Sequence, residues 1–182
     1  MAVVALRLPP FVPPVIGVPG EADVPALIAL INTLVAEHSQ LFIHPVDPVS
    51  GVATLRAHLA AIAGNGAEAV LVARDGAELV GLITGTRGSH PARFGTVDIG
   101  LGVLRTHRDR GIGFALLAAL ECWARGVGCH RLQLHVVVGN TPAIALYRKA
   151  GFDIEGMLKA TAMVDGHPLD ELQMAKLLEP VA

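Results

Sequence analysis

The sequence predicts an α/β fold in which one mixed, mostly antiparallel sheet is flanked by helices, and three observations favour it. The dipeptides Asp75-Gly76 and Asp165-Gly166 each lie between two apolar runs, a pattern typical of β-hairpins. An apolar strand over 97–103 leads into an amphipathic helix. Because a helix connects it to the next strand, at 130–138, these two strands are expected to pair in parallel.

The composition favours a globular protein that binds neither nucleic acid nor membranes. Hydrophobic residues make up 52% of the chain and charged residues 16%, which argues against disorder. A net charge of −2 and the lack of Lys or Arg runs predict no basic surface, and no stretch is long enough to span a bilayer. We therefore expect a cytoplasmic protein. The eight histidines and the cysteines Cys122 and Cys129 show no metal-ligand or disulfide spacing, so no metal is expected.

The chain begins with an apolar, proline-rich segment at 1–14, followed by one predicted domain at 15–182. The segment is either an irregular strand or a piece packed on a partner subunit, which leaves a homodimer open. A short strand is predicted at 15–18. Asp23 is expected to cap a helix that tolerates Pro25 in its first turn and has an apolar stripe. The stripe consists of Val24, Leu27, Ile28, Ile31, Leu34 and Val35.

Loops separate the next elements. A loop from His38 to Gly51, with Phe42, His44 and Asp47, precedes a helix that ends near Gly64-Asn-Gly66. The first hairpin joins strands at 69–73 and 79–84, and a loop from Arg87 to Arg93 leads into the next strand.

The stretch 97–117 predicts a phosphate-binding site. Val97, Ile99, Leu101 and Val103 alternate with polar or small residues as in a strand, and from Gly113 onward apolar residues follow a helical period. A helix begins with unpaired N–H groups and a partial positive charge, which an anion can satisfy. Gly111 and Gly113 let the backbone approach a phosphate, and Arg108 and Arg110 add charged donors.

The last third predicts a strand, a helix and a hairpin. The helix follows the strand at 130–138, with Thr141 as its cap, Pro142 at its first position and Gly151 as its stop. Strands at 152–164 and 169–178 then flank the second hairpin turn.

Two motifs resemble one family. A dinucleotide-binding motif fits poorly because Leu116 replaces a third glycine, and no Gly-Lys-Ser/Thr follows to make a Walker A loop. Arg108-x-x-Gly111-x-Gly113 instead resembles motif A of the GCN5-related N-acetyltransferase (GNAT) superfamily. Asn140-x-x-Ala143-x-x-x-Tyr147-x-x-x-Gly151-Phe152 resembles its motif B. The resemblance covers roughly 15–178, which identifies 15–182 as a GNAT acetyltransferase domain.

The resemblance implies that acetyl-CoA binds between two parallel strands that splay apart. The backbone of Leu101, Gly102 and Val103 would pair with the pantetheine arm and polarise the acetyl carbonyl. Asn140 would bond the pantetheine or an ordered water, or merely cap its helix. Asp109 stands where a glycine is common, which predicts a modest cofactor affinity. The pyrophosphate would be held by the remaining motif A residues, Arg108, Asp109, Arg110, Gly111, Ile112, Gly113 and Phe114.

Three side chains are candidates for catalysis. Tyr147 matches the family's usual general acid, although it could simply pack on its helix face. His135 is a candidate base, since the family branch that acetylates protein N-termini carries a glutamate there; a satisfied core histidine is the alternative. Asp98, beside Gly100 and Gly102 on its strand face, is a second candidate base or a paired structural carboxylate.

These expectations define a reaction. At pH 7 about one α-amine in ten is neutral, against roughly one lysine side chain in 2,500, so small amino-acid-like amines or protein N-termini are favoured acceptors. We expect direct transfer to such a small-molecule or peptide amine in a ternary complex, with the acceptor held by the loops at 38–51 and 87–93 and by the end hairpin. A non-catalytic CoA-binding or sensing module is the alternative, and a nicotinamide-dependent dehydrogenase is a third option.

Overall fold

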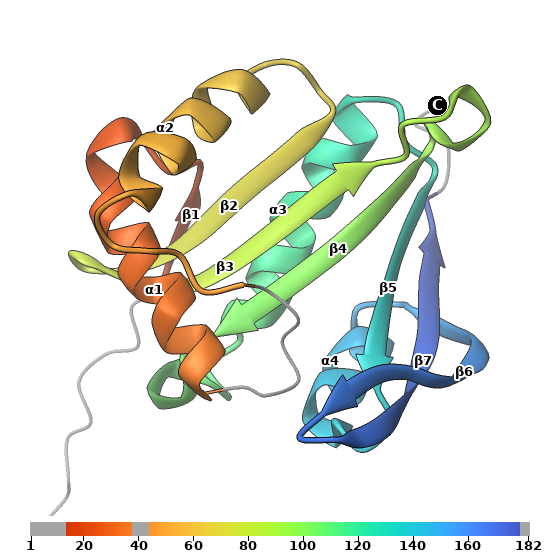
Figure 1. Cartoon of the computed structure of the whole chain (residues 1–182). Helices are drawn as coiled ribbons and strands as arrows, with labels where there is room; N and C mark the ends of the chain where they lie inside the picture. Colours follow the sequence, from red (N-terminus) through yellow and green to blue (C-terminus); the bar gives the residue numbers. More distant parts are fainter. Residues whose placement is uncertain (1–13, 38–43, 179–182) are drawn as a thin grey trace, which may run out of the picture.

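A computed structural model describes residues 14–37 and 44–178 (Figure 1). The expectations for the N-terminal segment up to residue 13, and for His38 and Phe42 in the first loop, lie outside the described residues. Within the described ranges, no helix is long and apolar enough to cross a membrane.

The described residues form one seven-stranded sheet with the order β1-β2-β3-β4-β5-β7-β6. Every neighbouring pair is antiparallel except β4 and β5, which are parallel as the sequence predicts. The mixed, mostly antiparallel sheet is thereby confirmed. The strands are β1 (Val15–Gly17), β2 (Glu68–Asp75), β3 (Glu78–Arg87), β4 (Thr96–Val103), β5 (Arg131–Val137), β6 (Asp153–Val164) and β7 (His167–Leu177).

Helices cover both faces of this sheet (Figure 1). On the β2–β4 part, α1 and α2 lie on one face and α3 on the other, while α4 lies behind β5 and β7. On β3, a Cβ added to Gly85 would lie 2.7 Å from Cδ1 of Leu120, so the missing side chain lets α3 pack closely on the sheet. The helices are α1 (Val24–Glu37), α2 (Gly51–Ile62), α3 (Ile112–Gly126) and α4 (Thr141–Lys149), with short 3₁₀ turns at Glu21–Asp23, Pro91–Arg93 and Arg105–His107.

Both predicted hairpins form, with different turns. Asp75 pairs with Glu78, so the first turn has Gly76 at its leading central position with φ 60°, which a glycine adopts without strain. In the second turn, Val164 pairs with His167, and Asp165 and Gly166 both have positive φ values, as a type I′ turn requires.

Of the two predicted helix caps, Asp23 directly precedes α1 but its side chain bonds backward to Gly20, and the cap of α4 is off by one residue. Asp23 ends a short 3₁₀ turn before α1. Its carboxylate accepts a hydrogen bond from the Gly20 N–H at 2.6 Å and forms an ion pair with Arg74. In α4 the cap is Asn140, whose Oδ1 accepts from the Ala143 N–H, while Thr141 occupies the first helical position. The short side chains of Asp, Asn and Thr all suit caps, so residue type alone does not place the boundary.

Glu121 on α3 links the helix to the sheet. Its carboxylate accepts from Lys176 Nζ of β7 at 2.6 Å and from Arg125 Nη2 at 2.9 Å. Burial raises the pKa of Glu121, but the hydrogen bonds from Lys176 and Arg125 outweigh burial and leave the pKa below its usual value. The lowered pKa means that the ionised carboxylate stabilises the fold.

We expect Glu121→Gln to lower the free energy of unfolding at pH 7 by about 1–2 kcal/mol, because a charge-assisted contact is lost. A folded-state pKa below the unfolded one gives stability that is present above about pH 4.5 and lost as the pH falls further. The difference between the two proteins in urea unfolding should therefore shrink as the pH falls below about 4. An unchanged difference at low pH would contradict the ion-pair account.

Candidate active site

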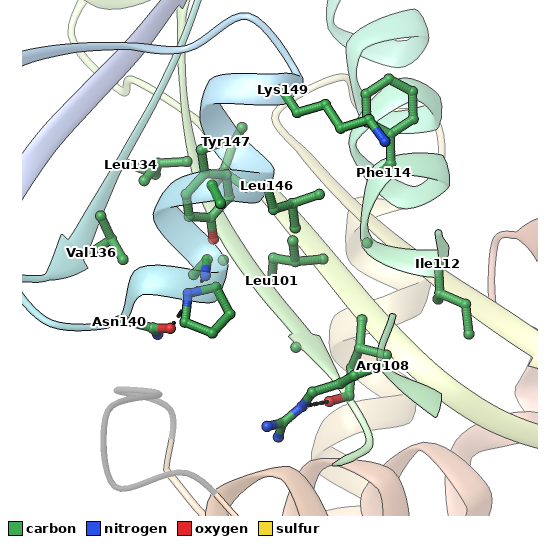
Figure 2. Close-up of a pocket in the computed structure, with 18 of the residues that line it drawn as sticks. Leu101, Arg108, Ile112, Phe114, Leu134, Val136, Asn140, Leu146, Tyr147 and Lys149 are labelled. Carbon is green, nitrogen blue, oxygen red and sulfur yellow. Dashed lines mark hydrogen bonds between the residues drawn. The ribbon is translucent and has the colours of Figure 1, made fainter. Parts of the chain in front are cut away.

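A cleft opens where β4 and β5 part (Figure 2). The parallel pairing runs from Thr96 and Arg131 only as far as Asp98 and Gln133, and beyond that point the strands have no register partners in each other. The space has a volume of about 970 Å³, near the upper end of ordinary small-molecule sites. It is lined by β4, the turn into α3, the start of α3, β5, α4 and one residue of β7.

Peptide groups of β4 point into this cleft. The Leu104 N–H donates to the Val80 carbonyl of β3, and peptide directions alternate along a strand, so Gly102 bonds toward β3 as well. Leu101 and Val103 therefore direct their peptide groups away from β3, toward the gap that β5 has left. Of the predicted stretch from Leu101 to Val103, the outer two residues direct backbone groups into the gap, where the Val103 carbonyl already accepts from Arg108 Nε. Gly102 lines the cleft without a side chain.

The N-terminus of α3 lies beside the mouth of the cleft. The first helical hydrogen bond runs from the Ala115 N–H to the Gly111 carbonyl. The N–H groups of Ile112, Gly113 and Phe114 thus belong to the first turn, where an α-helix offers no internal acceptors. Gly111 has φ 76°, and a Cβ added there would meet no protein atom within 4 Å. This geometry can hold an anion against backbone donors.

Gly113 has a packing role besides. A Cβ at this position would lie 2.8 Å from Cδ2 of Leu146, so the glycine lets α3 and α4 approach each other across the cleft. Phe114, the next residue, is 43% exposed, and the Lys149 Nζ of α4 lies 5.8 Å from the centre of its ring. Ile112 is buried in the core, which leaves only its backbone for a ligand.

The two motif arginines differ in placement. Arg108 lines the cleft, its Nε donates to the Val103 carbonyl at 3.3 Å, and its guanidinium lies 3.6 Å from Glu37. Arg110 is not among the lining residues; its Nη1 lies 3.8 Å from Asp75 in the first hairpin. The structure therefore brings Arg108, but not Arg110, to the predicted phosphate site.

Asp109 lines the cleft in a left-handed conformation, with φ 60°. We expect Asp109→Gly to bind acetyl-CoA about threefold to tenfold more tightly, because a negative charge near the pyrophosphate disappears. Stability should change little, since relief of about 1 kcal/mol of backbone strain offsets the lost attraction between an acid and a helix N-terminus. Calorimetric titration measures the affinity. Asp165→Gly is the control: Asp165 has φ 50° outside the cleft, and its replacement should leave the affinity unchanged.

Tyr147 stands on α4 with its ring buried and its hydroxyl directed into the cleft (Figure 2). The ring packs 5.8 Å from that of Phe152, centre to centre, and also lines the cleft. Burial raises the pKa of Tyr147 to about 12, so the phenol remains protonated at neutral pH. A fixed, protonated hydroxyl in the cleft can donate a hydrogen bond. The packing predicted as the alternative to catalysis is present as well, and the two roles are compatible.

Asn140 caps α4 and lines the cleft at the same time. Its Oδ1 accepts from the Ala143 N–H at 3.4 Å, which leaves the two N–H groups of the side-chain amide for other partners. The same side chain can therefore cap α4 through its oxygen and donate a hydrogen bond to a ligand through its nitrogen.

The two candidate bases lie on the same face of the sheet. His135 on β5 is exposed and lines the cleft, so it is not the buried core histidine considered as an alternative. Asp98, at the last parallel pair, accepts from Gln133 Nε2 at 2.7 Å. Gln133 is itself oriented by Arg131, whose Nε donates to its Oε1 at 3.1 Å. Asp98 thus has the hydrogen bonding of a paired structural carboxylate, whereas His135 faces the cleft and bonds to no side chain among the residues that the structure describes.

Sequence reasoning missed three ionisable residues that line the cleft. Lys149 lines the cleft from the last turn of α4. In the sequence it looks like an ordinary cation at a helix C-terminus, so nothing marks it as a site residue. His107 lies in the 3₁₀ turn after β4 and belongs to neither motif. Glu171 on β7 is distant in the sequence from every other lining residue, and only the sheet order β5-β7 reveals its position.

The predicted acceptor loops are only partly at the cleft. Neither 44–50 nor 87–93 supplies a lining residue, and the second of these precedes β4, at the opposite end from the cleft mouth. The end hairpin does contribute, through Glu171. Neither cysteine lines the cleft, and the described residues contain no group of three or more His, Cys, Asp or Glu side chains placed to hold a metal.

Comparison with known proteins gives the family. The sequence model of the acetyltransferase (GNAT) family matches residues 32–152, well over half of the chain. The L-methionine sulfoximine/L-methionine sulfone acetyltransferase of Pseudomonas paraeruginosa is 32% identical over 164 residues, which cover 88% of this chain and 92% of the relative.

Solved structures share the fold. The ribosomal-protein-alanine N-acetyltransferase of Brucella melitensis superposes with a TM-score of 0.79 at 31% identity, covering 90% of this chain and 99% of its own. The structure of yncA from Salmonella typhimurium with its cofactor acetyl-CoA gives a TM-score of 0.81 at 23% identity, covering 93% and 96%. The chain is an acyl-CoA-dependent acetyltransferase and belongs to the acetyltransferase (GNAT) family.

Proposed function

We propose that this enzyme transfers the acetyl group of acetyl-CoA to the primary amine of an amino-acid-like small molecule, by direct attack in a ternary complex. The observation that carries the proposal is the parting of β4 and β5 after Asp98 and Gln133, between the N-terminus of α3 and the hydroxyl of Tyr147. Bound acetyl-CoA supplies an activated acetyl thioester.

The cleft residues fit an elongated, anionic thioester. The first-turn N–H groups of α3 and the guanidinium of Arg108 lie at the mouth, where they can bind phosphate oxygens. Farther in, the peptide groups of Leu101 and Val103 can pair with the amides of a pantetheine arm as a neighbouring strand would. Leu134 and Val136 of β5 give the opposite wall an apolar surface (Figure 2).

The same groups can stabilise the charges that form during acyl transfer. A backbone N–H of β4 directed at the acetyl oxygen stabilises the negative charge that grows there, without having to reorient. At the sulfur, Tyr147 is best described as a hydrogen-bond donor. Its pKa of about 12 lies well above that of an ordinary thiol, about 8.5, so full proton transfer to a thiolate would be uphill.

The amine must lose a proton before it can attack, and His135 is the residue that we assign to this step. It is exposed on the face of β5 that lies beside the cleft, and a neutral imidazole carries a ring nitrogen that can accept a proton. Asp98 is the weaker candidate, because Gln133 already donates to its carboxylate.

The relative from Pseudomonas supports an amino-acid-like acceptor, since it aligns with most of this chain and its name describes acetylation of methionine derivatives. The test is an acceptor screen that measures free thiol released from acetyl-CoA. It should include the standard amino acids, L-methionine sulfone, short peptides with free N-termini, polyamines and small aminated antibiotics. Amine-dependent thiol release with amino acids supports the proposal, and its absence with every amine tested would overturn it.

A protein N-terminus is the second candidate acceptor. The Brucella structure is 31% identical to this chain, and its name describes acetylation of a ribosomal protein at alanine. Peptides in the same screen separate the two candidates: acetylation of peptides but not of free amino acids would favour the N-terminus. The screen compares kcat/KM for peptides with kcat/KM for free amino acids, because both kinds of acceptor carry an α-amine that can react.

A further inference from the structure

Glu171 is the one buried polar or charged residue among those that the structure describes. Only 7% of its surface is exposed. It stands on β7 opposite Val137 of β5, and it lines the cleft. Carboxylates are rarely buried without a partner, because removal from water disfavours their charge.

The Glu171 side chain has no hydrogen-bond or ion-pair partner among the described residues. Two other acids of the sheet differ: Asp170 accepts from Lys159 Nζ at 2.7 Å, and Asp98 accepts from Gln133. No fully buried side-chain oxygen or nitrogen of the described residues lacks a hydrogen bond. The unpaired oxygens of Glu171 must therefore keep contact with open space, and the open space that this residue lines is the cleft.

The sheet register places Glu171 near His135. His135 pairs with Gln173 and Val137 pairs with Glu171, and residues two apart on a strand share a face. His135 and Glu171 are thus diagonal cross-strand neighbours on one face, a relation that separates residues by about 7–8 Å. A primary amine between them would contact the carboxylate while it faces the imidazole.

We propose that Glu171 binds the ammonium group of the acceptor and holds its nitrogen at the thioester. The proposal rests on the proposed function above and adds the residue that recognises the amine. An unpaired, nearly buried carboxylate is matched by a compact cation that offers several N–H donors, and a primary ammonium has three.

The role of Glu171 continues during attack. As the nitrogen forms its bond to carbon, it becomes positively charged, and the fixed carboxylate beside it stabilises that charge. Glu171 is thus assigned to binding and orienting the amine, and His135 to receiving the proton that the ammonium loses before attack. The second proton leaves the nitrogen as the C–S bond breaks and passes to the departing thiolate, which leaves as the CoA thiol.

Glu171→Gln is the matched test, because it keeps the shape of the side chain and removes only its charge. With the best amine from the acceptor screen, we expect KM for the amine to rise about 10-fold to 100-fold, as for loss of a hydrogen bond to a charged group. KM for acetyl-CoA should stay unchanged. Thermal unfolding without ligand should shift to higher temperature, because an unpaired buried charge has been removed. Glu171→Asp should partly restore amine binding.

A second arm does not depend on the identity of the acceptor. CoA-loaded protein is titrated with butylammonium chloride and, as a neutral probe of similar size, with butanol. Wild type should bind butylammonium more tightly than butanol, and Glu171→Gln should lose this preference. Equal binding of both probes by wild type, or an unchanged preference in Glu171→Gln, would overturn the assignment. An acceptor screen without any product would instead contradict the proposed function, while the titration still decides the role of Glu171.

Discussion

Replacement of Tyr147 by Phe should lower kcat about 100-fold or more and leave the affinity for acetyl-CoA unchanged. The ring is buried against Phe152, so Phe keeps the packing and removes only the hydroxyl that points into the cleft. Stopped assays of thiol release measure kcat, and calorimetry with CoA measures binding. Loss of CoA affinity together with kcat would mean that the hydroxyl positions the cofactor rather than assisting the leaving thiolate.

The pH dependence provides an independent check on Tyr147. Burial raises the pKa of Tyr147 to about 12, so the hydroxyl should remain protonated throughout the range in which the enzyme can be assayed. The ratio of kcat between wild type and Tyr147→Phe should therefore stay constant from about pH 6 to about pH 9.5. A phenol with the ordinary pKa of about 10 would instead begin to ionise, and the ratio would fall toward the alkaline end.

The elements of the fold that depend on local chemistry were predictable from the sequence. The hairpin turns at Gly76 and at 165–166 require positive φ, and the helical period of α3 buries Leu116, Leu117 and Leu120 as expected. The parallel pairing of β4 and β5 followed from the helix between them. Cap positions were less predictable, because Asn140 and Thr141 are both good caps and only their backbone angles distinguish them.

The site was predictable where it is continuous in sequence. The turn from Arg108 to Phe114 and the helix after Asn140 each form one wall of the cleft, and short motifs capture them. Glu171 could not be found this way, since its position depends on β7 inserting between β5 and β6, which no local pattern reports. Arg110 shows the converse: its motif position predicts a phosphate contact, but the neighbouring hairpin supplies Asp75 as a partner.

Gly111→Ala should weaken acetyl-CoA binding at least about 10-fold, because a methyl group would project toward the anion held by the first turn of α3. The protein itself has room for it, since no protein atom lies within 4 Å of a Cβ at this position. The variant also carries a backbone cost. Gly111 has φ 76°, and a left-handed conformation costs a residue with a Cβ about 1–2 kcal/mol.

Gly128→Ala separates these two effects. Gly128 follows the other end of α3, has φ 75°, has no atom within 4 Å of an added Cβ, and does not line the cleft. Both variants should therefore lose about the same free energy of unfolding, about 1–2 kcal/mol. Saturating acetyl-CoA should then raise the melting temperature of Gly128→Ala as much as that of wild type, and that of Gly111→Ala much less. Equal ligand-induced shifts in the two variants would place the diphosphate somewhere other than the N-terminus of α3.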